Sequence, residues 1–469
     1  MRLIMKFGGT AIDSGQKVIH VANLIKSYRY KKYDEIVSVI SAVRGITDEI
    51  LSISNSVKRG DKISIIDFIK RTRMAHLAII DESISDRKLK DEARMVITKL
   101  IDELQDILEG IVLLTEVTPK SLDYLLSFGE RLSTPIVSFA LRDIGLASDY
   151  IIGKEVGILT DSNFGEARPL MDTTKLRVAH KIEPLLREGI IPIVTGFIGA
   201  DQNGNITTLG RGGSDYTATI IAASINADEI WLWSDVDGLM TADPKIVSSA
   251  KVLKEVSYAE AMEMALFGAK YIHPRALEPI LDSKIPIIIR NTFNVKHEGT
   301  IISHNPSMTS KKIVKSISAI RHTALIDVSG GGMVGTPGTA AKIFDTLAKN
   351  RVNIMMISQS PSESSISMVV RKSDLDKATT TFELNLLGKI IKQLNVNEDV
   401  AIIAVVGSGM RGIKGVAAKV FGSVARRNIN VMMIAQGSSE LNLAFVVNDN
   451  DCEQAVRALH DEFGLANIE

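Results

Sequence analysis

A lysine and two glycines near the N-terminus are the first residues whose types and spacing could perform chemistry. The chain begins MRLIMKFGGT, a short apolar run that ends in Lys6 and is followed by Gly8 and Gly9. Glycines expose backbone N–H groups, and a nearby ammonium group adds positive charge, so together they can hold a phosphate. A tight turn with a surface lysine would show the same residues, because short motifs often occur by chance. The phosphate hypothesis therefore depends on the rest of the sequence.

A second glycine-rich segment, TLGRGGSDY, follows a predicted strand and precedes a helix that is predicted to begin at about Tyr216. Asp215 stands where the dinucleotide fingerprint has its last glycine, and the P-loop pattern is absent, so neither common nucleotide loop is present. Backbone amides before a helix suit an anion, and the planar guanidinium of Arg211 suits a carboxylate. A structural turn in which Ser214 or Asp215 caps the helix is the alternative.

Three further segments place charged or polar groups near predicted turns. SDVDGLMTADPK puts Ser234 and Asp235 at the carboxyl end of a strand, where ligands collect in α/β proteins. ALFGAKYIHP puts Lys270 after a Gly-Ala pair, where a solvated surface lysine is the alternative. In LLSFGERLS, Glu130 follows a Phe-Gly pair at a predicted helix interruption. Neither zinc-ligand spacing nor a Ser-His-Asp set is present, and the inventory suits phosphoryl transfer, which depends on positioning and charge neutralisation.

These segments need a scaffold, and the first 300 residues alternate short Ile- and Val-rich runs with longer helical patterns. The runs that predict buried strands are DEIVSVISAV, GIIPIVTGFIG, NITTLG, DEIWLWSDV and KIPIIIRNT. Such alternation favours an α/β domain with a largely parallel sheet. Residues 56–145 are almost wholly helical in pattern, and their charge runs indicate solvent-facing helix surfaces.

Length and composition limit the class of protein. At 469 residues the chain is too long for one core, and 45% hydrophobic with 23% charged residues is ordinary for a soluble globular protein. The 55 basic and 55 acidic residues balance, which argues against nucleic acid and membrane surfaces as partners. A single cysteine excludes an internal disulfide. The sequence shows neither a signal-peptide pattern nor a membrane-spanning run, and together with the single cysteine this predicts a cytoplasmic protein.

The last third of the chain repeats itself. AKIFDTLAKNRVNIMMISQSPSESSISMVV (341–370) aligns without a gap on AKVFGSVARRNINVMMIAQGSSELNLAFVV (418–447), a shift of 77 residues with 13 of 30 positions identical. Each copy has the order strand, glycine-rich turn, helix, strand, strand, helix of a ferredoxin-like βαββαβ unit. A structural module without a ligand is the alternative. The predicted domains are residues 1–300, a linker at 301–321, and the two copies at 322–398 and 399–469.

Six motifs, in order, resemble those of the aspartate kinases, which are members of the amino-acid kinase family. They are KFGGT, SAVRGIT (41–47), SFGERLS (127–133), TLGRGGSD (208–215), SDVDGLMTADP (234–244) and GAKYIHP (268–274). The resemblance covers essentially the whole chain, because the repeat resembles the paired ACT domains of this family. It implies an αβα sandwich with a mainly parallel sheet, followed by two ferredoxin-like ACT domains. It also implies ATP-dependent phosphorylation of the L-aspartate β-carboxylate, the first step of lysine, threonine and methionine biosynthesis.

The resemblance also implies roles for individual residues. The residues implied to act at the transferring phosphate are Lys6, Gly8, Gly9, Lys270 and Asp215, the last of which would orient the catalytic lysine. Those implied to bind aspartate are Ser41, Thr47, Glu130 at the ammonium, and Arg211, Gly212, Gly213 and Ser214 at the α-carboxylate. The further nucleotide contacts are Ser234, Asp235, Met240, Lys245 and Tyr271. Mg²⁺ would be held mainly by the nucleotide phosphates, without a dedicated protein site. No general base is needed, because a β-carboxylate with a pKa of about 3.9 is already ionised.

The ACT repeat implies feedback by an amino-acid end product, threonine or lysine, between SGGGMVGTPG (329–338) and VNIMMISQS (352–360). A buried lysine effector would need an acidic partner for its ε-ammonium. Lysine-sensitive members have an aspartate in an N-I-x-V-D pattern where this chain has methionine, so threonine is favoured. The remaining acidic candidates are Asp327, Asp345 and Glu363. The predicted effector contacts are Met333, Gly338, Asn353, Ile354 and Gln359. Sheet edges also predict a homodimer or homotetramer through the ACT domains.

Two other interpretations stay open at the level of sequence. Another amino-acid kinase, of the glutamate or N-acetylglutamate type, would share the fold. However, an acetylated amine would leave Glu130 nothing to neutralise, and the ACT pair would be unexplained. A non-catalytic amino-acid-sensing regulator would have lost the machinery, whereas Lys6, Arg211, Asp215 and Lys270 are all present.

Overall fold

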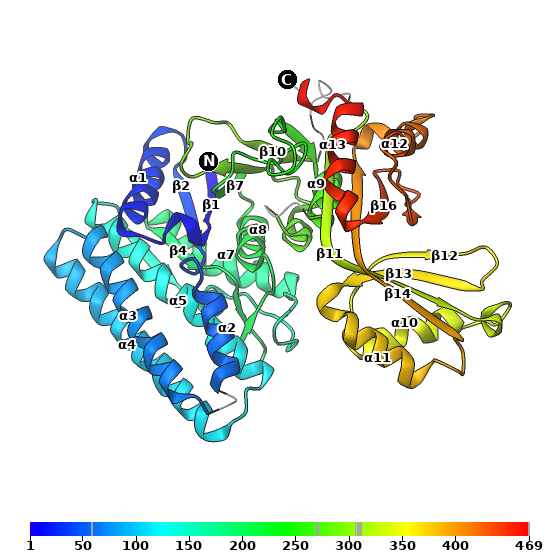
Figure 1. Cartoon of the computed structure of the whole chain (residues 1–469). Coiled ribbons are helices and arrows are strands. Elements are labelled where there is room, and N and C mark those ends of the chain that lie inside the picture. The colour runs from blue at the N-terminus through cyan, green and yellow to red at the C-terminus, as the bar shows by residue number, and fades with distance from the viewer. Residues whose placement is uncertain (58–59, 269–271, 305, 307–311, 468–469) are drawn as a thin grey trace. The chain divides into compact units, whose positions relative to one another are not determined.

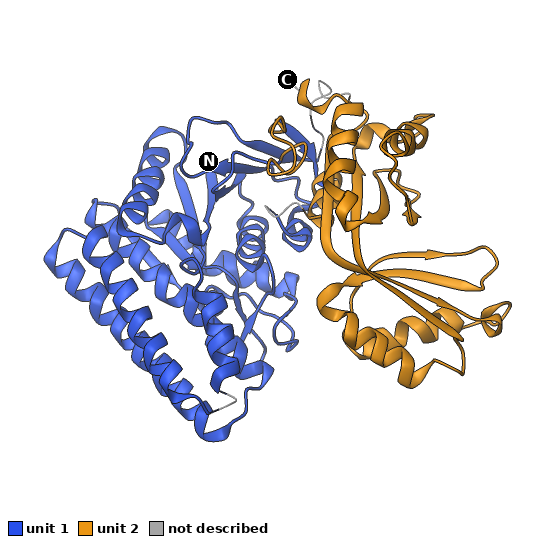
Figure 2. Cartoon of the chain, viewed as in Figure 1, with its two compact units in different colours: residues 1–239, 254–258, 271–306 blue, residues 240–253, 259–270, 307–469 orange. Residues whose placement is uncertain are grey.

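The protein folds into two compact units, which Figure 2 draws in different colours. The structure, a computed structural model, describes residues 1–57, 60–268, 272–304, 306 and 312–467. The first unit comprises Met1–Leu239, Lys254–Tyr258 and Tyr271–Pro306, and the second comprises Met240–Leu253, Ala259–Lys270 and Ser307–Glu469. Two short segments of the predicted catalytic domain, 240–253 and 259–270, therefore belong to the second unit.

The first unit is built on an eight-stranded sheet with the order β3-β4-β2-β1-β7-β9-β10-β8. Its strands are β1 (Arg2–Phe7), β2 (Glu35–Ile40), β3 (Ser148–Ile151), β4 (Ile191–Thr195), β7 (Glu229–Ser234), β8 (Glu255–Ser257), β9 (Ile287–Asn291) and β10 (Thr300–Ser303). β10 pairs antiparallel with β9, and the other neighbours pair in parallel. Leu3, Ile4 and Met5 of β1 are fully buried, and each such side chain stabilises the fold by about 1.5–3 kcal/mol.

Helices cover the sheet on both faces, as Figure 1 shows. α5 packs against β2, β3 and β4 and against α1, whereas α8 packs against β1, β2 and β7 and against α7. The helices are α1 (Gly15–Lys31), α2 (Ile46–Val57), α3 (Lys62–Ser83), α4 (Arg87–Leu114), α5 (Pro119–Asp143), α6 (Gly153–Val156), α7 (Met171–Arg187) and α8 (Gly213–Ile225). The predicted αβα sandwich with a mainly parallel sheet is confirmed.

The helical region predicted at residues 56–145 is present as long helices, but the predicted interruption beside Glu130 is wrong. α5 runs without a break from Pro119 to Asp143. Gly129 lies in the middle of this helix, and the residue is glycine because a Cβ there would lie 2.7 Å from the Cβ of Ala42. The glycine therefore allows the loop after β2 to approach the helix, and it marks close packing where the sequence suggested a break.

A small antiparallel hairpin accompanies the large sheet. The predicted strand NITTLG is present as β6 (Ile206–Thr208), but it pairs with β5 (Ile198–Ala200) outside the eight-stranded sheet. Short 3₁₀ helices of this unit are η1 (Gly9–Ala11) and η2 (Pro274–Ile280). Helix α9 (Tyr258–Leu266) begins at the last residue of a first-unit segment and continues in the second unit.

The second unit holds the repeat, built on a six-stranded sheet with the order β12-β13-β11-β14-β16-β15. Its strands are β11 (Ser316–Ser329), β12 (Ile354–Gln359), β13 (Ser365–Arg371), β14 (Gln393–Val406), β15 (Met433–Ala435) and β16 (Asn442–Asn448). Its helices are α10 (Thr339–Lys349), α11 (Leu375–Asn385), α12 (Val416–Ala425) and α13 (Cys452–Glu462), with 3₁₀ turns η3 (Gly331–Met333), η4 (Lys372–Asp374), η5 (Ser408–Met410), η6 (Asp449–Asp451) and η7 (Leu465–Asn467). The two predicted ferredoxin-like units are confirmed.

The two copies share their two longest strands. Thr323–Ser329 of β11 pairs with β13 of the first copy, while Ser316–Ile320 of the same strand pairs with 402–406 in β14 of the second copy. In β14, residues 393–397 pair with the first-copy part of β11, whereas residues 400–406 pair with β16 of the second copy. The stretch 301–321, predicted as a linker, therefore contains strand residues at both of its ends, which corrects that prediction. The second copy needs this strand because the backbone groups of β14 that face away from β16 would otherwise lack hydrogen-bond partners.

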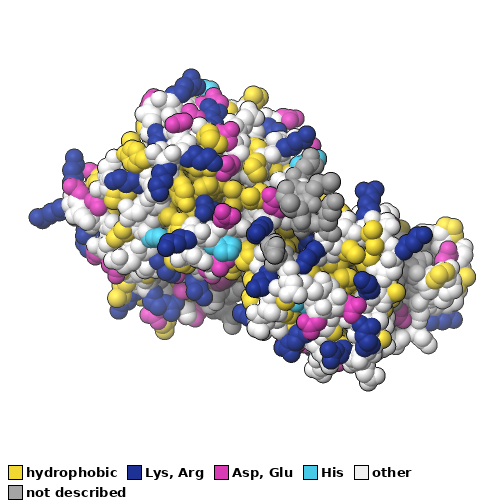
Figure 3. Space-filling view, turned by 90° about the horizontal axis from the view of Figure 1, so that it is seen from above, with side chains coloured by type: hydrophobic (Ala, Val, Ile, Leu, Met, Phe, Trp, Pro, Cys, Tyr) yellow, Lys and Arg dark blue, Asp and Glu magenta, His cyan; other side chains and the backbone are white. Residues whose placement is uncertain are grey.

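Charged side chains of both signs are interspersed on the face that Figure 3 shows, as expected from equal numbers of 55 acidic and 55 basic residues. None of the helices in the described ranges is long and apolar enough to cross a membrane. The cytoplasmic location stays a prediction from sequence.

Candidate functional site

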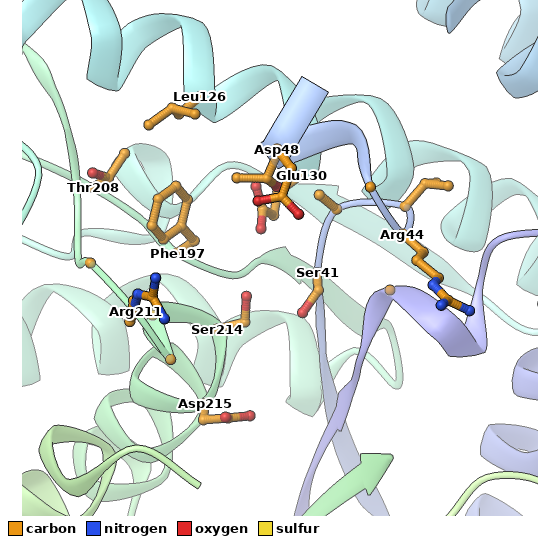
Figure 4. Close-up of a pocket in the computed structure, with 18 of the residues that line it drawn as sticks. Ser41, Arg44, Asp48, Leu126, Glu130, Phe197, Thr208, Arg211, Ser214 and Asp215 are labelled. Atoms are coloured by element: carbon orange, nitrogen blue, oxygen red, sulfur yellow. The ribbon is translucent and has the colours of Figure 1, made fainter. Parts of the chain in front are cut away.

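A pocket lies where the loops after several parallel strands meet. Phe7 at the end of β1 is paired with Ile40 of β2 and with Trp233 of β7, so these strands end at one edge of the sheet. The cavity has a volume of about 560 Å³. Its lining is Lys6, Gly9, Thr10, Ser41, Ala42, Val43, Arg44, Gly45, Thr47, Asp48, Leu126, Glu130, Gly165, Phe197, Thr208, Gly210, Arg211, Gly212, Gly213, Ser214 and Asp215. Figure 4 shows part of this lining. All the residues predicted to bind aspartate are among them.

The predicted catalytic lysine lies at the end of β1. Its ammonium nitrogen is 2.7 Å from a carboxylate oxygen of Asp215, in the first turn of α8. The Lys6 and Asp215 side chains are 15% and 12% exposed, so this ion pair is only weakly screened by water. The structure thus brings together two residues that are 209 positions apart in sequence and fixes the direction of the lysine.

The two glycines after Lys6 differ in their surroundings. The N–H of Gly8 donates to the carbonyl oxygen of Trp233 at 3.3 Å, so the hypothesis that this amide is available to a phosphate is wrong. Gly9 begins the short helix η1, and Gly9 and Thr10 line the pocket. A Cβ at Gly9 would lie 2.4 Å from the carbonyl oxygen of Ala42, so only glycine lets the loops after β1 and β2 touch.

Glu130 is a buried acid that faces the pocket. It is 4% exposed, and its Oε2 atom has no hydrogen-bond partner in the part of the chain that the structure describes. Burial raises the pKa of Glu130 to about 8, while backbone amides and the charge of Lys6 act in the opposite direction. A carboxyl group in such a position is stabilised in its charged form by a cationic ligand. It therefore suits an ammonium group.

The TLGRGG loop connects the β5–β6 hairpin to α8. Gly212 has φ of 70° and a Cβ there would lie 2.3 Å from the Cβ of His273, so both conformation and space require glycine. α8 starts at Gly213 with Gly212 as its N-cap. The predicted start near Tyr216 and the alternative of a Ser214 or Asp215 cap are therefore wrong.

Arg211 of this loop lines the pocket and forms no ion pair with any described residue. Figure 4 shows Arg211 and Ser214 on one side of the close-up, apart from Glu130. The pocket thus presents an unpaired guanidinium and a buried carboxylate from separate walls. An amino acid, with its carboxylate and its ammonium, has matching charges of opposite sign.

Sequence reasoning missed the residue that holds this loop in place. Asp123, seven residues before Glu130 on α5, is fully buried and accepts hydrogen bonds from the Thr208 N–H and hydroxyl, both at 2.8 Å, and from the Gly165 N–H at 3.0 Å. Burial raises the pKa of Asp123. A spacing of seven puts both acids on one helix face, and this was the signal available in the sequence.

Phe197 was also missed. It lines the pocket with φ of 69°, a conformation that is uncommon for a residue with a side chain. Its N–H donates to the Thr217 hydroxyl at 3.0 Å, which helps to hold it there. No sequence signal marks Phe197, because the strain depends on the packing around it.

Of the residues predicted to complete the nucleotide site, Ser234, Asp235, Met240 and Lys245 do not line this pocket. Ser234 ends β7 beside β1, and its hydroxyl donates to Asp235 at 3.2 Å. Met240 and Lys245 belong to the second unit. Lys270 and Tyr271 lie outside the described residues. Within the described ranges, no group of three His, Cys, Asp or Glu side chains is arranged to hold a metal ion.

The residues predicted to bind an effector are distributed over the first ACT copy. Met333 is buried in the core, and Gly338, with φ of 85°, is the N-cap of α10. Asn353 precedes the edge strand β12, which contains Ile354 and Gln359. The Met333 side chain is therefore closed to a ligand, and its N–H already donates to the carbonyl oxygen of Gly330 at 3.0 Å.

Comparisons with known proteins agree with this architecture. Residues 1–291 match the amino acid kinase family, and residues 326–383 and 403–463 match an ACT domain. The chain is 32% identical over 471 residues to chloroplastic aspartokinase 1 of Arabidopsis thaliana, covering 98% of this chain and 80% of that protein. It is also 32% identical over 473 residues to a chloroplastic bifunctional aspartokinase/homoserine dehydrogenase of Zea mays, covering 99% of this chain and 50% of that protein.

Two solved structures of aspartokinase III from E. coli are similar over nearly the whole chain. The complex with aspartate and ADP has a TM-score of 0.85 at 28% identity, covering 98% of this chain and 99% of that one. The complex with lysine and aspartate has a TM-score of 0.79 at 29% identity and the same coverage. With the family match over residues 1–291 and the pocket built from its motifs, the chain belongs to the aspartate kinases of the amino acid kinase family.

Proposed function

We propose that the pocket binds L-aspartate and MgATP, and that its residues have the following roles in making 4-phospho-L-aspartate. Glu130 binds the substrate ammonium, and Arg211 with the adjacent loop binds the α-carboxylate. The β-carboxylate oxygen attacks the γ-phosphorus, a new O–P bond forms, and the bond to the oxygen that leaves with ADP breaks. No proton has to be removed from the nucleophile, so the pocket needs no general base. Its cationic groups, Lys6 and Arg211, serve to neutralise the negative charge of the phosphate and of the substrate.

The observation that supports this substrate best is the buried carboxyl of Glu130 with one oxygen unpartnered among the described residues. Such a group is costly in an empty pocket, and a cationic ligand offsets the cost. N-acetylglutamate has no ammonium and would leave Glu130 unpaired. This observation therefore favours a free amino acid over an acylated one.

Lys6 is the residue that we propose for the transferring phosphoryl group, with Asp215 2.7 Å from its ammonium to orient it. The first turn of η1, at Gly9 and Thr10, offers backbone amides beside it. Mg²⁺ would neutralise phosphate charge and be held mainly by the nucleotide. The other proposed nucleotide contacts are Ser234, Asp235, Met240, Lys245, Lys270 and Tyr271.

Trapping with hydroxylamine tests the reaction, because acyl phosphates are converted to hydroxamates. The protein with MgATP should yield hydroxamate from L-aspartate and hardly any from L-glutamate or N-acetylglutamate. Arg211→Ala should raise the KM for aspartate and leave that for ATP nearly unchanged, since the guanidinium is proposed to contact only the amino acid. Equal turnover of glutamate, or an Arg211→Ala effect confined to ATP, would contradict the proposal.

We also propose that an amino-acid end product inhibits the enzyme through the first ACT copy, and that threonine is favoured over lysine. The acidic groups that could receive the ε-ammonium of lysine already have partners. Asp327 accepts from the Ser367 hydroxyl at 2.8 Å, Glu363 accepts from the Gly335 N–H at 3.0 Å, and Asp345 pairs with Lys349 at 2.6 Å. Separate titrations of activity with threonine, lysine and methionine test the choice, and stronger inhibition by lysine would reverse it.

The ACT sheet supports a further proposal, a homodimer or homotetramer. Its edge strands β12 and β15 carry Ile357 and Ile434, which are 44% and 46% exposed. Unpaired edges with apolar side chains favour pairing with another copy. Deleting 322–469 would cut β11, so substitution is the better test. Ile357→Lys and Ile434→Lys should lower the mass measured by light scattering, and an unchanged mass would place the contact elsewhere.

A further inference from the structure

A second arginine, Arg44, lines the pocket and has no part in the reaction as described so far. It lies in the loop of residues 41–45, between β2 and α2. The cavity that it lines also contains Lys6, Gly9 and Thr10, the residues proposed for the phosphate end. Arg44 is exposed, and it forms neither an ion pair nor a hydrogen bond with any residue that the structure describes. Its guanidinium is therefore free to bind a ligand.

The backbone of the Arg44 loop is held against the end of β1 and against η1. The N–H of Ser41 donates to the carbonyl oxygen of Phe7 at 3.2 Å, and the Ser41 carbonyl oxygen accepts from the Ser133 hydroxyl at 2.7 Å. A Cβ at Gly9 would lie 3.0 Å from the backbone nitrogen of Arg44 and 3.3 Å from its Cα, so the two backbones are in contact. The base of the Arg44 side chain is thus fixed beside Gly9.

The other charged groups of the lining supply little net positive charge to a phosphate. The Lys6 ammonium is 2.7 Å from the Asp215 carboxylate, so the charges of this pair offset each other. Arg211 is proposed for the α-carboxylate of the substrate, and Glu130 for its ammonium. Phosphoryl transfer brings a carboxylate and a charged phosphoryl group together, and their repulsion has to be offset by positive charge. Of the cations that line the cavity, Arg44 is the one without a counter-charge or a role.

The two arginines of the pocket lie on different walls. Figure 4 shows Arg44 on the opposite side of the close-up from Arg211, with its guanidinium pointing away from Glu130 and Asp48. Asp48, in the first turn of α2, lines the same cavity and forms no ion pair with Arg44. This arrangement suits two separate anions. A planar guanidinium can donate two parallel hydrogen bonds to a phosphate as well as to a carboxylate.

We propose that Arg44 is a catalytic residue whose guanidinium donates hydrogen bonds to non-bridging oxygens of the γ-phosphoryl group of MgATP. The inference rests on the proposed function and adds a residue to it. As the β-carboxylate oxygen bonds to phosphorus, the bond between phosphorus and the bridging oxygen breaks, and its electron pair leaves with ADP. No proton is transferred. The guanidinium offsets negative charge on the phosphoryl group during this step.

Calorimetric titration of the full-length protein with MgADP and with the Mg²⁺ complex of AMP-PNP, the β,γ-imido analogue of ATP, tests the contact. Arg44→Ala should weaken AMP-PNP binding by about tenfold and leave ADP binding unchanged, because only AMP-PNP has a γ-phosphoryl group. Arg44→Lys keeps the charge and lacks the planar fork, so its affinity should lie between the two. Arg87→Ala removes an exposed arginine of α4 that does not line the cavity, and this matched control should bind both nucleotides as the wild type does.

Steady-state kinetics in the hydroxylamine assay provide a second readout. Arg44→Ala should lower kcat by about tenfold or more, as expected for loss of a charged donor to the transferring group. The effect should be smaller than that of Lys6→Ala, because Arg44 is exposed and water screens its charge. The KM for aspartate should stay nearly unchanged, since Arg44 is not proposed to contact the amino acid.

Three results overturn the inference. Unchanged AMP-PNP affinity in Arg44→Ala would show that Arg44 does not contact the γ-phosphoryl group. An equal loss of affinity for ADP and AMP-PNP would place Arg44 at the other phosphates, and a rise confined to the aspartate KM would place it at the amino acid.

Failure of the proposed function gives a different pattern, because the nucleotide titrations contain no aspartate. A protein that makes no hydroxamate from aspartate, but whose AMP-PNP affinity falls in Arg44→Ala, would refute the proposed substrate and retain the Arg44 contact. If the wild type binds neither nucleotide, the proposed function and this inference both fail.

Discussion

The pocket of the first unit and the first ACT turn of the second, η3 (Gly331–Met333), are both rich in glycine, and their glycines differ in what surrounds them. A Cβ at Gly9 would lie 2.4 Å from the Ala42 carbonyl oxygen, and one at Gly212 would lie 2.3 Å from the Cβ of His273. In the ACT turn, a Cβ at Gly331 would meet nothing within 4 Å, and one at Gly332 only the Ile390 carbonyl oxygen at 3.8 Å.

The difference teaches that one residue type serves two purposes. In the pocket, glycine lets backbones touch, which locks the loops in one geometry, as stabilisation of a transition state requires. In the first ACT turn, glycine leaves space beside the backbone. The second ACT turn, η5 (Ser408–Met410), resembles the pocket, since a Cβ at Gly409 would lie 2.5 Å from the Lys312 carbonyl oxygen, and the Ser408 N–H of this turn donates to the carboxylate of Glu260.

The largest effect is expected on kcat, from removal of the Lys6 ammonium that the pocket holds in place. Lys6→Ala should lower kcat by about 100-fold or more, because it removes positive charge from the transferring phosphoryl group. Lys31→Ala, at the exposed end of α1, is the control and should leave kcat unchanged. Steady-state kinetics with saturating aspartate and MgATP measure both. If the Lys6→Ala enzyme keeps the kcat of the wild type, the proposed role of Lys6 at the transferring phosphoryl group is wrong.

The next effect concerns Glu130 and depends on pH. With a pKa of about 8, the ligand-free acid is protonated at lower pH, whereas the substrate ammonium favours the ionised form. The apparent KM for aspartate should therefore fall as the pH rises toward about 8, by up to about tenfold per pH unit. In Glu130→Gln the KM for aspartate should be high and should not show this dependence on pH. Identical pH profiles of the two proteins would contradict the assigned contact.

Replacement of Glu130 by glutamine should also increase the stability of the folded protein. The pKa of Glu130 is raised from 4.5 to about 8, so between these values the folded chain keeps a proton that the unfolded chain releases. This group therefore lowers stability progressively as the pH rises through that window. Glu130→Gln should raise the Tm of the ligand-free protein more at pH of about 8 than at about 5. An increase that is the same at both pH values would argue against the raised pKa.

The third effect separates the two glycines after Lys6. Gly9→Ala should destabilise the protein by about 1–3 kcal/mol, because the loops after β1 and β2 would be forced apart. At Gly8 a Cβ would lie 3.7 Å from the Trp233 carbonyl oxygen, an ordinary contact, so Gly8→Ala should change stability by about 0.5 kcal/mol or less. Denaturant titration measures both, and equal losses would show that the loop contact does not distinguish them.

The smallest effect is expected in the first ACT turn. Gly332→Ala should change stability by about 0.5 kcal/mol or less, whereas its repeat counterpart Gly409→Ala should cost about 1–3 kcal/mol. The two positions have the same sequence context of Gly-Met, so the difference isolates the packing around the second turn. If both substitutions proved neutral in thermal unfolding, the second turn would be as open as the first.

Several features of the protein were determined by the sequence alone. The Ile- and Val-rich runs predicted the parallel strands, because a strand buried on both faces needs apolar side chains at successive positions. The ungapped match of 30 residues at a shift of 77 predicted two equivalent units. Side-chain chemistry also marked Lys6 and Arg211 as candidates, since charge and hydrogen-bonding capacity belong to the residue type, and the family resemblance added Glu130.

The tertiary structure decided what depends on distance. The Gly129 position was misread as a helix break, because its reason, the approach of Ala42, involves a residue 87 positions away. The part of Asp123 in holding the TLGRGG loop and the binding of Glu260 to Ser408 also join segments that are remote in sequence. The fourth strand of the second ACT copy is supplied by residues 316–320, which precede the first copy. Local sequence records what a residue can do, whereas the choice of its partner is made only when the chain packs.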